Sequence, residues 1–257
     1  MAICQGNVGA EVEIFDHFLA PDNDLTWGTG TVQVSRFGFV SDDEGSFEWT
    51  VDEANGVLAI TTDVGDNDSA VLMAGTLIPN VSGPIVTEWR LKVNDVAAGG
   101  VAVFVGFTET LSLSAPVMPA EFATATMTYN GTGQILGAQL DADGTVIDWR
   151  AVSGDAGAVV GTNRATRAAL ATAGIRANET LTADEWYIVR VELSSEGVGE
   201  VWVGHKNRGL DLILTVTGVP VVNPLYAICM VENRSGNAKV MEVDYGYVKG
   251  YCDWEVT

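Results

Sequence analysis

Apolar and polar residues alternate with a period of two over many short stretches of this chain. The clearest stretch is Glu185–Thr217, which predicts three strands joined by two turns. Alternate side chains of a strand lie on opposite faces of a sheet, so each apolar set needs a second layer to cover it. The predicted strands are Trp186–Leu193, Glu200–Lys206 and Leu210–Thr217, and the expected inward residues of the last are Leu212, Leu214 and Val216.

The same pattern predicts further strands along the rest of the chain. Val101–Thr108 is apolar at nearly every position, which is typical of a central strand buried on both faces. A second meander is predicted at Ala123–Tyr129, Ile135–Asp141 and Thr145–Val152. The other predicted strands are Glu11–Leu19, Val32–Val40, Ser46–Val51, Val57–Thr62, Ala70–Gly75, Leu77–Ile78, Ile85–Val93, Tyr226–Glu232 and Lys239–Lys249.

Many short strands separated by short loops predict an all-β, antiparallel, two-sheet sandwich. We expect one domain over residues 11–250, with an N-terminal arm at 1–10 and a C-terminal tail at 251–257. The Ala-rich segment 154–178 interrupts the pattern as an irregular or helical insertion. At most one short helix is expected there, at Thr162–Gly174.

Composition narrows the possible partners. The chain has 257 residues, of which 34 are acidic and 13 basic, giving a net charge of −21. Such a charge disfavours nucleic acid and anionic membrane surfaces, and leaves basic protein patches, cations and neutral sugars as plausible partners. No signal peptide and no membrane-spanning apolar run are visible, so we expect synthesis in a host cytoplasm.

The three cysteines are too few and too scattered for a disulfide framework or a zinc site. Cys229 lies in an apolar run and is expected in the core. Cys4 and Cys252 lie near opposite ends of the chain, so a bridge between them stays possible. A reducing compartment is the default for such cysteine usage.

Several stretches occur in a characteristic order along the chain: Phe15–Leu19, Trp27, Gly56–Thr62, Val103–Glu109, Asp141–Val152, Trp186–Val191 and Val243–Val248. This order resembles the concanavalin A-like lectin/glucanase jelly roll, and within it a group of bacteriophage virion proteins. In the opening, Asp16-His17-Phe18-Leu19 stands where the group has Asp-Asp-Phe-Leu, so His17 replaces the second acid. The segment 154–178 has no clear counterpart.

The resemblance implies a jelly-roll sandwich and a non-enzymatic structural role in the virion, most simply a capsid decoration or minor capsid protein on the particle's exterior. It also implies capsid or other virion proteins as partners, and homo-oligomers on a symmetric lattice. Two other functions stay open. One is a carbohydrate-binding module of a fibre or surface assembly, which would bind a host glycan through exposed Trp or Tyr on a concave sheet. The other is a glucanase-like glycoside hydrolase.

No catalytic set can be assembled from the sequence. Glucanases of this superfamily carry Glu-x-Asp-x-x-Glu on one strand, which supplies two carboxylates for acid and nucleophile roles. The nearest matches are Glu11-x-Glu13-x-x-Asp16 and Glu242-x-Asp244, and both depart from the motif. His17 and His205 have no Ser, Cys or Asp partner at a suggestive spacing. We therefore expect no enzymatic activity and no cofactor.

Three acidic loops are weak candidates for Ca²⁺, at Asp22–Asp24, Asp63–Asp68 and Asp141–Asp143, but none completes a calcium loop. We expect no metal site. The seven tryptophans fall mostly on predicted strands, so core or sheet-face packing is expected for most of them.

One local anomaly suggests a protein-interaction site. Arg164, Arg167 and Arg176 are three of the 13 basic residues and lie within the segment that departs from the sandwich pattern. An arginine cluster on a protruding element of an acidic protein could clamp carboxylates of a neighbour. The alternative is a solvated or internally paired set, with Asp155 or Glu179 as partners.

Overall fold

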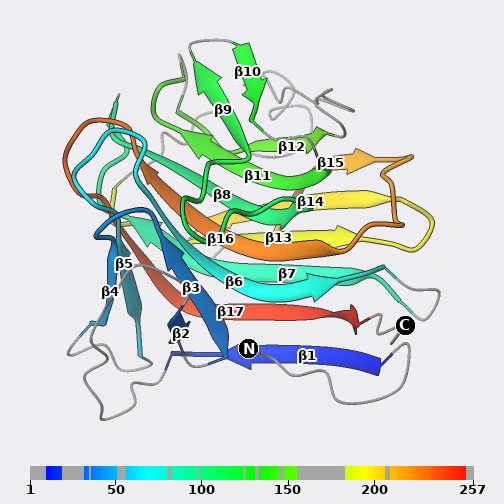
Figure 1. The fold of residues 1–257 in the computed structure, drawn as a ribbon. Helices are drawn as coiled ribbons and strands as arrows, with labels where there is room; N and C mark the ends of the chain where they lie inside the picture. Colours follow the sequence, from blue (N-terminus) through cyan, green and yellow to red (C-terminus); the bar gives the residue numbers. More distant parts are fainter. Residues whose placement is uncertain are drawn as a thin grey trace.

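The computed structural model describes residues 10–18, 32–34, 36–50, 56–79, 83–97, 99–123, 126–130, 133–144, 147–154, 183–205 and 209–252. These residues form two large antiparallel sheets and one small hairpin (Figure 1). No helix occurs among the described residues, so none there is long and apolar enough to cross a membrane. The possible helix at Thr162–Gly174 lies outside these ranges.

Sheet A has eight strands. They are β1 (Ala10–Asp16), β4 (Ser46–Trp49), β5 (Leu58–Thr61), β7 (Ile85–Val93), β13 (Tyr187–Leu193), β14 (Gly199–His205), β15 (Asp211–Val216) and β17 (Val240–Cys252). Their order is β15-β14-β13-β7-β17-β5-β4, and β1 pairs with the second half of β17, as Figure 1 shows. The meander that the sequence predicts is confirmed as β13-β14-β15.

Sheet B has seven strands. They are β2 (Val32–Val34), β3 (Phe37–Ser41), β6 (Ser69–Leu77), β8 (Val101–Thr108), β11 (Ile135–Asp141), β12 (Arg150–Gly154) and β16 (Leu225–Asn233). Their order is β12-β11-β8-β16-β6-β3-β2. Every residue of β8 is buried, which confirms the central position expected from its apolar sequence.

Some predicted strands differ from the structure because the chain reverses where the pattern continues. Val32–Val40 is two strands, since Val32–Val34 folds back on Phe37–Phe39 as a tight hairpin. Ala123–Tyr129 is also not one strand of a meander: β9 (Ala120–Ala123) and β10 (Thr126–Tyr129) pair only with each other. The strand predicted at Thr145–Val152 begins at Arg150, and the two strands predicted at Ala70–Gly75 and Leu77–Ile78 are one.

A β-bulge corrects the faces predicted for β15. Val201 of β14 pairs with Leu214, whereas Trp202 pairs with Leu212, so Ile213 is skipped. A bulge places two consecutive residues opposite one and shifts the alternation. Ile213 is therefore buried together with Leu214 and Val216, and Leu212, which was expected inside, is 39% exposed.

The core lies between the two sheets, and Trp89 of β7 is its largest fully buried side chain. Its ring lies 4.7 Å from the Phe37 ring of the opposite sheet, and its indole N–H donates to the Thr87 hydroxyl at 2.7 Å. Gly246 of β17 leaves room for this pair. A Cβ at position 246 would lie 2.5 Å from Trp89 Cζ3 and 3.0 Å from Phe37 Cε2.

We predict that Gly246→Ala destabilises the protein, by about 1–3 kcal/mol, because the added methyl overpacks the Trp89 site. The measurement is the free energy of unfolding from urea titration. Gly75→Ala is the matched control, since a Cβ at this strand position meets nothing within 4 Å. Equal effects of the two substitutions would contradict the packing explanation.

Candidate functional site

A second apolar cluster covers the outer face of sheet B, the face that points away from sheet A. Sheet B contributes Phe104, Ile228 and Met230, among others, and the segment above it contributes Met118 and Phe122. This cover consists of residues 111–119 and the β9–β10 hairpin, which Figure 1 shows standing over β11 and β12. The outer face of sheet B is therefore filled where these side chains meet.

Polar side chains of sheet B hold the backbone of the cover. Glu232 Oε2 accepts the Met118 N–H at 3.1 Å, and Asp141 Oδ2 accepts the Phe122 N–H at 2.8 Å. The Gln139 amide donates to the Ala120 carbonyl. In addition, the Ser69 hydroxyl donates to the Pro116 carbonyl at 2.6 Å. These four anchoring side chains are all buried, so water competes poorly for their hydrogen bonds.

Arg234 joins two of these anchors. Its Nη1 lies 2.6 Å from Glu232 Oε1, and its Nη2 lies 3.0 Å from Asp141 Oδ2. Its Nη1 also donates to Asn67 Oδ1 at 3.0 Å. The side chains of Arg234, Glu232 and Asp141 are 3%, 1% and 1% exposed, so two carboxylates share a single cation in a buried site. Removal of one member of such a cluster leaves a buried charge without its partner.

The pKa of Glu232 is perturbed, chiefly by burial. Burial raises its pKa to about 7, helped by the negative charges of Glu121 and Asp141, although Arg234 and the Met118 N–H act in the opposite direction. A raised pKa at a carboxylate is a common property of catalytic acids. Here, however, both carboxylate oxygens face protein groups, and the cover lies above them.

A small pocket lies at the edge of the cover, between Thr108, Ser112, Met118 and Asn130. Its volume is about 100 Å³, whereas pockets for small organic ligands usually measure roughly 300–1,000 Å³. The amide of Asn130 is already used, because it donates to the Met118 carbonyl at 3.2 Å. This pocket is too small for a sugar ring.

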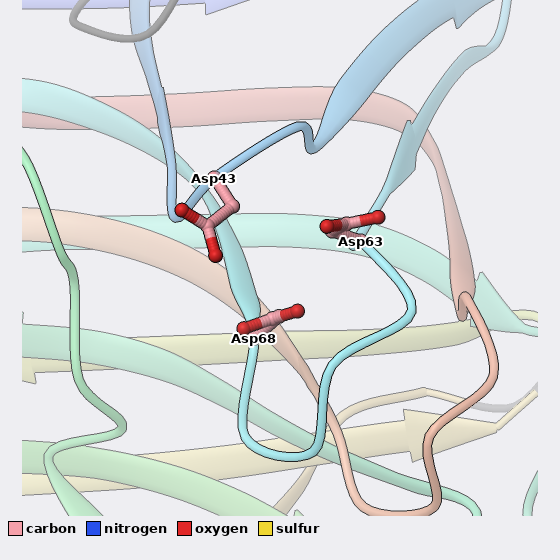
Figure 2. Close-up of side chains that lie close together, drawn as sticks. All are labelled: Asp43, Asp63 and Asp68. Atoms are coloured by element: carbon pink, nitrogen blue, oxygen red, sulfur yellow. The ribbon is translucent and has the colours of Figure 1, made fainter.

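A group of three aspartates lies where the β3–β4 turn meets the β5–β6 connection (Figure 2). Asp43 comes from the β3–β4 turn, Asp63 follows β5, and Asp68 precedes β6. One carboxylate oxygen of each lies within 4.8 Å of the others. Asn233 holds this loop, since its amide donates to the carbonyls of Asp63 and Gly65 at 3.2 and 2.9 Å.

Asp68 is the buried member of this group. Burial raises its pKa, the Gly65 N–H lowers it, and the negative charges of Asp42, Asp63 and Asp43 raise it further. Clustered carboxylates can hold a hard cation such as Ca²⁺, but Ca²⁺ takes 6–8 oxygen ligands in proteins. The three aspartates supply only part of such a set. The sequence indicated Asp63–Asp68 as a candidate Ca²⁺ loop but did not indicate Asp43, which only the fold brings close to them.

The outer face of sheet A differs, because it is crossed by ion pairs and no described segment packs over it. The near-matches to the glucanase motif lie here. Glu242 pairs with Lys92 at 2.9 Å, Asp244 pairs with Arg90, and Glu11 pairs with Lys249 at 3.0 Å. Glu13 accepts a hydrogen bond from the Tyr247 hydroxyl at 3.1 Å. The acids are thus spread over β1 and β17 and mostly bound by neighbours, rather than facing each other.

Among the remaining candidates, Cys229, Trp89 and Trp149 are buried as expected, and Asp141 of the third acidic loop belongs to the Arg234 cluster. A further set lies outside the described residues, namely Arg164, Arg167, Arg176, Asp22–Asp24, Cys4, Trp27 and Trp254. The docking role of the three arginines and the Cys4–Cys252 bridge therefore stay predictions.

No known protein family matches this sequence, and no curated protein does either. Solved structures do match its fold. A protein of unknown function from Shewanella oneidensis MR-1 has a TM-score of 0.55 at 11% identity, over 95% of this chain and 88% of that one. The cellulose-induced protein Cip1 has a TM-score of 0.51 at 13% identity, over 91% of this chain and 96% of that one.

Peanut lectin is also similar, with a TM-score of 0.49 at 11% identity, over 95% of this chain and 100% of that one. The chain is an all-β jelly-roll sandwich of two antiparallel sheets. Its two antiparallel sheets and the order of their strands confirm the fold class expected from the sequence. At these identities the likeness concerns the fold alone.

We predict that Glu232 makes the protein less stable as the pH rises. A folded-state pKa of about 7, above the ordinary 4.5, means that the folded protein holds this proton more tightly than the unfolded chain. The stabilisation is present below about pH 4.5 and is lost as the pH rises to about 7. The loss is on the order of 2–3 kcal/mol.

Urea titrations at several pH values measure this slope. We expect Glu232→Gln to flatten it, whereas Glu48→Gln, an exposed residue of β4, should leave it unchanged. The same slope in wild type and Glu232→Gln would show that another group is responsible.

For the aspartate group, we predict that Asp68→Asn stabilises the protein at neutral pH in the presence of a chelator. The raised pKa means that ionised Asp68 costs stability above its ordinary titration range, and asparagine removes that charge. Thermal unfolding measures the change, and Asp211→Asn, an exposed residue of β15, is the control. If wild type is the more stable of the two in chelator, the repulsion argument is wrong. Repeating the scan in CaCl₂ tests whether the three carboxylates hold the cation.

Proposed function

We propose that this chain is a non-enzymatic virion structural protein that acts by attachment, most simply as a capsid decoration or minor capsid protein on the outside of a phage particle. The observation that supports this best is the closed outer face of sheet B. In glucanases of the superfamily, paired carboxylates work in an open cleft on a sheet. Here the buried carboxylates Glu232 and Asp141 bind Arg234 and the backbone of the cover.

The stretches that resemble phage virion proteins also lie in strands that build the sandwich. Val103–Phe107 lies within the central strand β8, and Val243–Val248 lies within β17, which pairs with β7, β5 and β1. They contribute to the core and to strand pairing, not to a reaction site. A rigid sandwich of this kind can add contact area to a particle without chemistry.

The net charge of −21 suits a partner with basic surface patches. On a symmetric capsid, copies of the chain would meet identical sites, and contacts between copies would strengthen weak individual binding. Homo-oligomers, a position on the capsid exterior and synthesis in the host cytoplasm belong to this proposal.

The carbohydrate-binding alternative expects exposed Trp or Tyr on a concave sheet. The outer face of sheet B instead carries the filled apolar cluster around Phe104 and Met230. No tryptophan among the described residues is exposed, and the Trp186 ring is covered by Arg90 and Lys92 at 4.5 and 4.9 Å from its centroid. These features favour attachment to protein over stacking on sugar.

The test is copurification with intact particles. We expect the chain to stay with virions through two successive density gradients and to be present in a fixed copy number set by capsid symmetry, because a decoration protein occupies equivalent lattice sites. Quantitative mass spectrometry measures the ratio to the major capsid protein, and an abundant host cytosolic protein is the contamination control. Absence from particles, or a variable trace amount, would refute the proposal.

A further inference from the structure

Four aromatic rings gather on the outer face of sheet A, at the junction of β1 and β17. We call Phe15, His17, Tyr245 and Tyr247 the aromatic patch. The Phe15 ring lies 4.5 Å from His17, 5.6 Å from Tyr245 and 6.3 Å from Tyr247, measured between centroids. Phe15 is 46% exposed and His17 is exposed as well. An exposed cluster of large rings usually marks an interaction surface.

A bulge in β17 creates this patch. Val243 pairs with Leu91 of β7, but Tyr245 pairs with the adjacent Arg90, so one residue of β17 is unmatched. Before the bulge, Met241 and Val243 point into the core. After it, Gly246 and Val248 are the buried residues, and both tyrosines turn outward. Without the shift, the alternation would have put Tyr245 in the core.

Hydrogen bonds hold both tyrosines in place. The Tyr245 hydroxyl donates to Glu88 Oε1 at 2.7 Å, and the Tyr247 hydroxyl donates to Glu13 Oε1 at 3.1 Å. Glu88 is itself held by Arg190 at 3.1 Å. Rings fixed in this way lose little conformational entropy when a partner binds, which favours affinity.

The charges around the patch are unbalanced. The neighbouring cations are already paired, Lys249 with Glu11 and Arg190 with Glu88 and Glu192. Glu13 lies on the same face of β1 as Phe15 and has no cationic partner among the described residues. Asp16 pairs with Gly246 and therefore points to the inner face of the sheet, where one of its oxygens accepts the Phe18 N–H at 2.8 Å and the other is buried. The negative charge beside the exposed ring is therefore that of Glu13.

We propose that the aromatic patch binds an arginine or lysine side chain from a basic segment of a partner protein. Aromatic faces attract cations, and the strength grows when carboxylates assist. The chain's charge of −21 would steer a basic segment toward the surface. This inference deepens the proposed function, on which it rests for the partner's place in a virion but not for the binding chemistry.

A sugar fits the patch less well. Sugar recognition combines ring stacking with hydrogen bonds from free polar groups. Here both tyrosine hydroxyls already donate to Glu88 and Glu13, and the second Glu88 oxygen accepts from Arg190. The charged group that remains at the patch is the Glu13 carboxylate, and a negative charge suits a cation better than a neutral sugar.

The probe is a capped glycine–arginine peptide with three arginines, titrated into the whole chain and followed by amide chemical shifts. We expect shifts centred on Phe15, Tyr245 and Tyr247. The same peptide with citrulline in place of arginine keeps the shape without the charge and should not bind. Equal binding of the two peptides, or shifts centred elsewhere, would overturn the proposal.

Two variants test the roles of the ring and the carboxylate. Phe15→Leu keeps an apolar side chain but removes the aromatic face, and Glu13→Gln removes the charge. We expect each to weaken peptide binding by about three- to ten-fold, within the range of cation–π energies. The controls are Val222→Ala, a residue 77% exposed elsewhere, and Glu48→Gln, which changes net charge equally. If the controls weaken binding as much, only the overall charge attracts the peptide and the proposal is wrong.

A neutral glucan hexasaccharide is titrated in parallel. If it shifts the patch amides and the arginine peptide does not, the patch is a carbohydrate site and the proposal fails. Particle copurification is independent of these titrations. The patch chemistry and the virion role can therefore fail separately.

Discussion

Sheet B must be kept dry on both faces, and much of the molecule follows from this constraint. All residues of β8 and β11 are buried, so neither strand has a side for water. Sheet A covers one face, and residues 111–119 with the β9–β10 hairpin cover the other. Burial of each large apolar side chain contributes about 1.5–3 kcal/mol, so the cover stabilises the fold as well as excluding water from the sheet.

The cover brings buried polar groups with it, because much of its backbone lacks a pairing strand. Residues 111–119 are irregular, and β9 pairs with β10 along one edge only, so backbone groups remain that pairing does not satisfy. Side chains of the sheet supply the missing partners, and two of these are carboxylates. Arg234 then becomes necessary, since two buried carboxylates without a cation would cost far more than their hydrogen bonds contribute. Thus the buried ionic cluster is a consequence of covering sheet B.

The sequence predicts the parts of the fold that depend on local pattern. Ile85–Val93, Val101–Thr108 and Ile135–Asp141 have the bounds expected from alternation or from continuous apolarity. Bulges escape such prediction, because one extra residue at β14–β15 or in β17 changes which face a side chain takes. The Arg234 cluster escapes it too. Arg234 and Asp141 are 93 positions apart, and nothing in the sequence around either residue indicates that they meet.

The outer faces of the two sheets differ in role: that of sheet B contributes to stability, and that of sheet A is where we expect contact with a partner. Sheet B uses its outer face to bind its own chain, so this face has little left to offer a partner. No described segment covers the outer face of sheet A, and the ion pairs there cost little because their side chains are partly exposed to water. The bulge in β17 adds two tyrosines to that face, beside an exposed phenylalanine on β1. A sequence that needed only a stable sandwich would gain nothing from placing aromatic rings in water, and this is why sheet A is the face where we expect a partner.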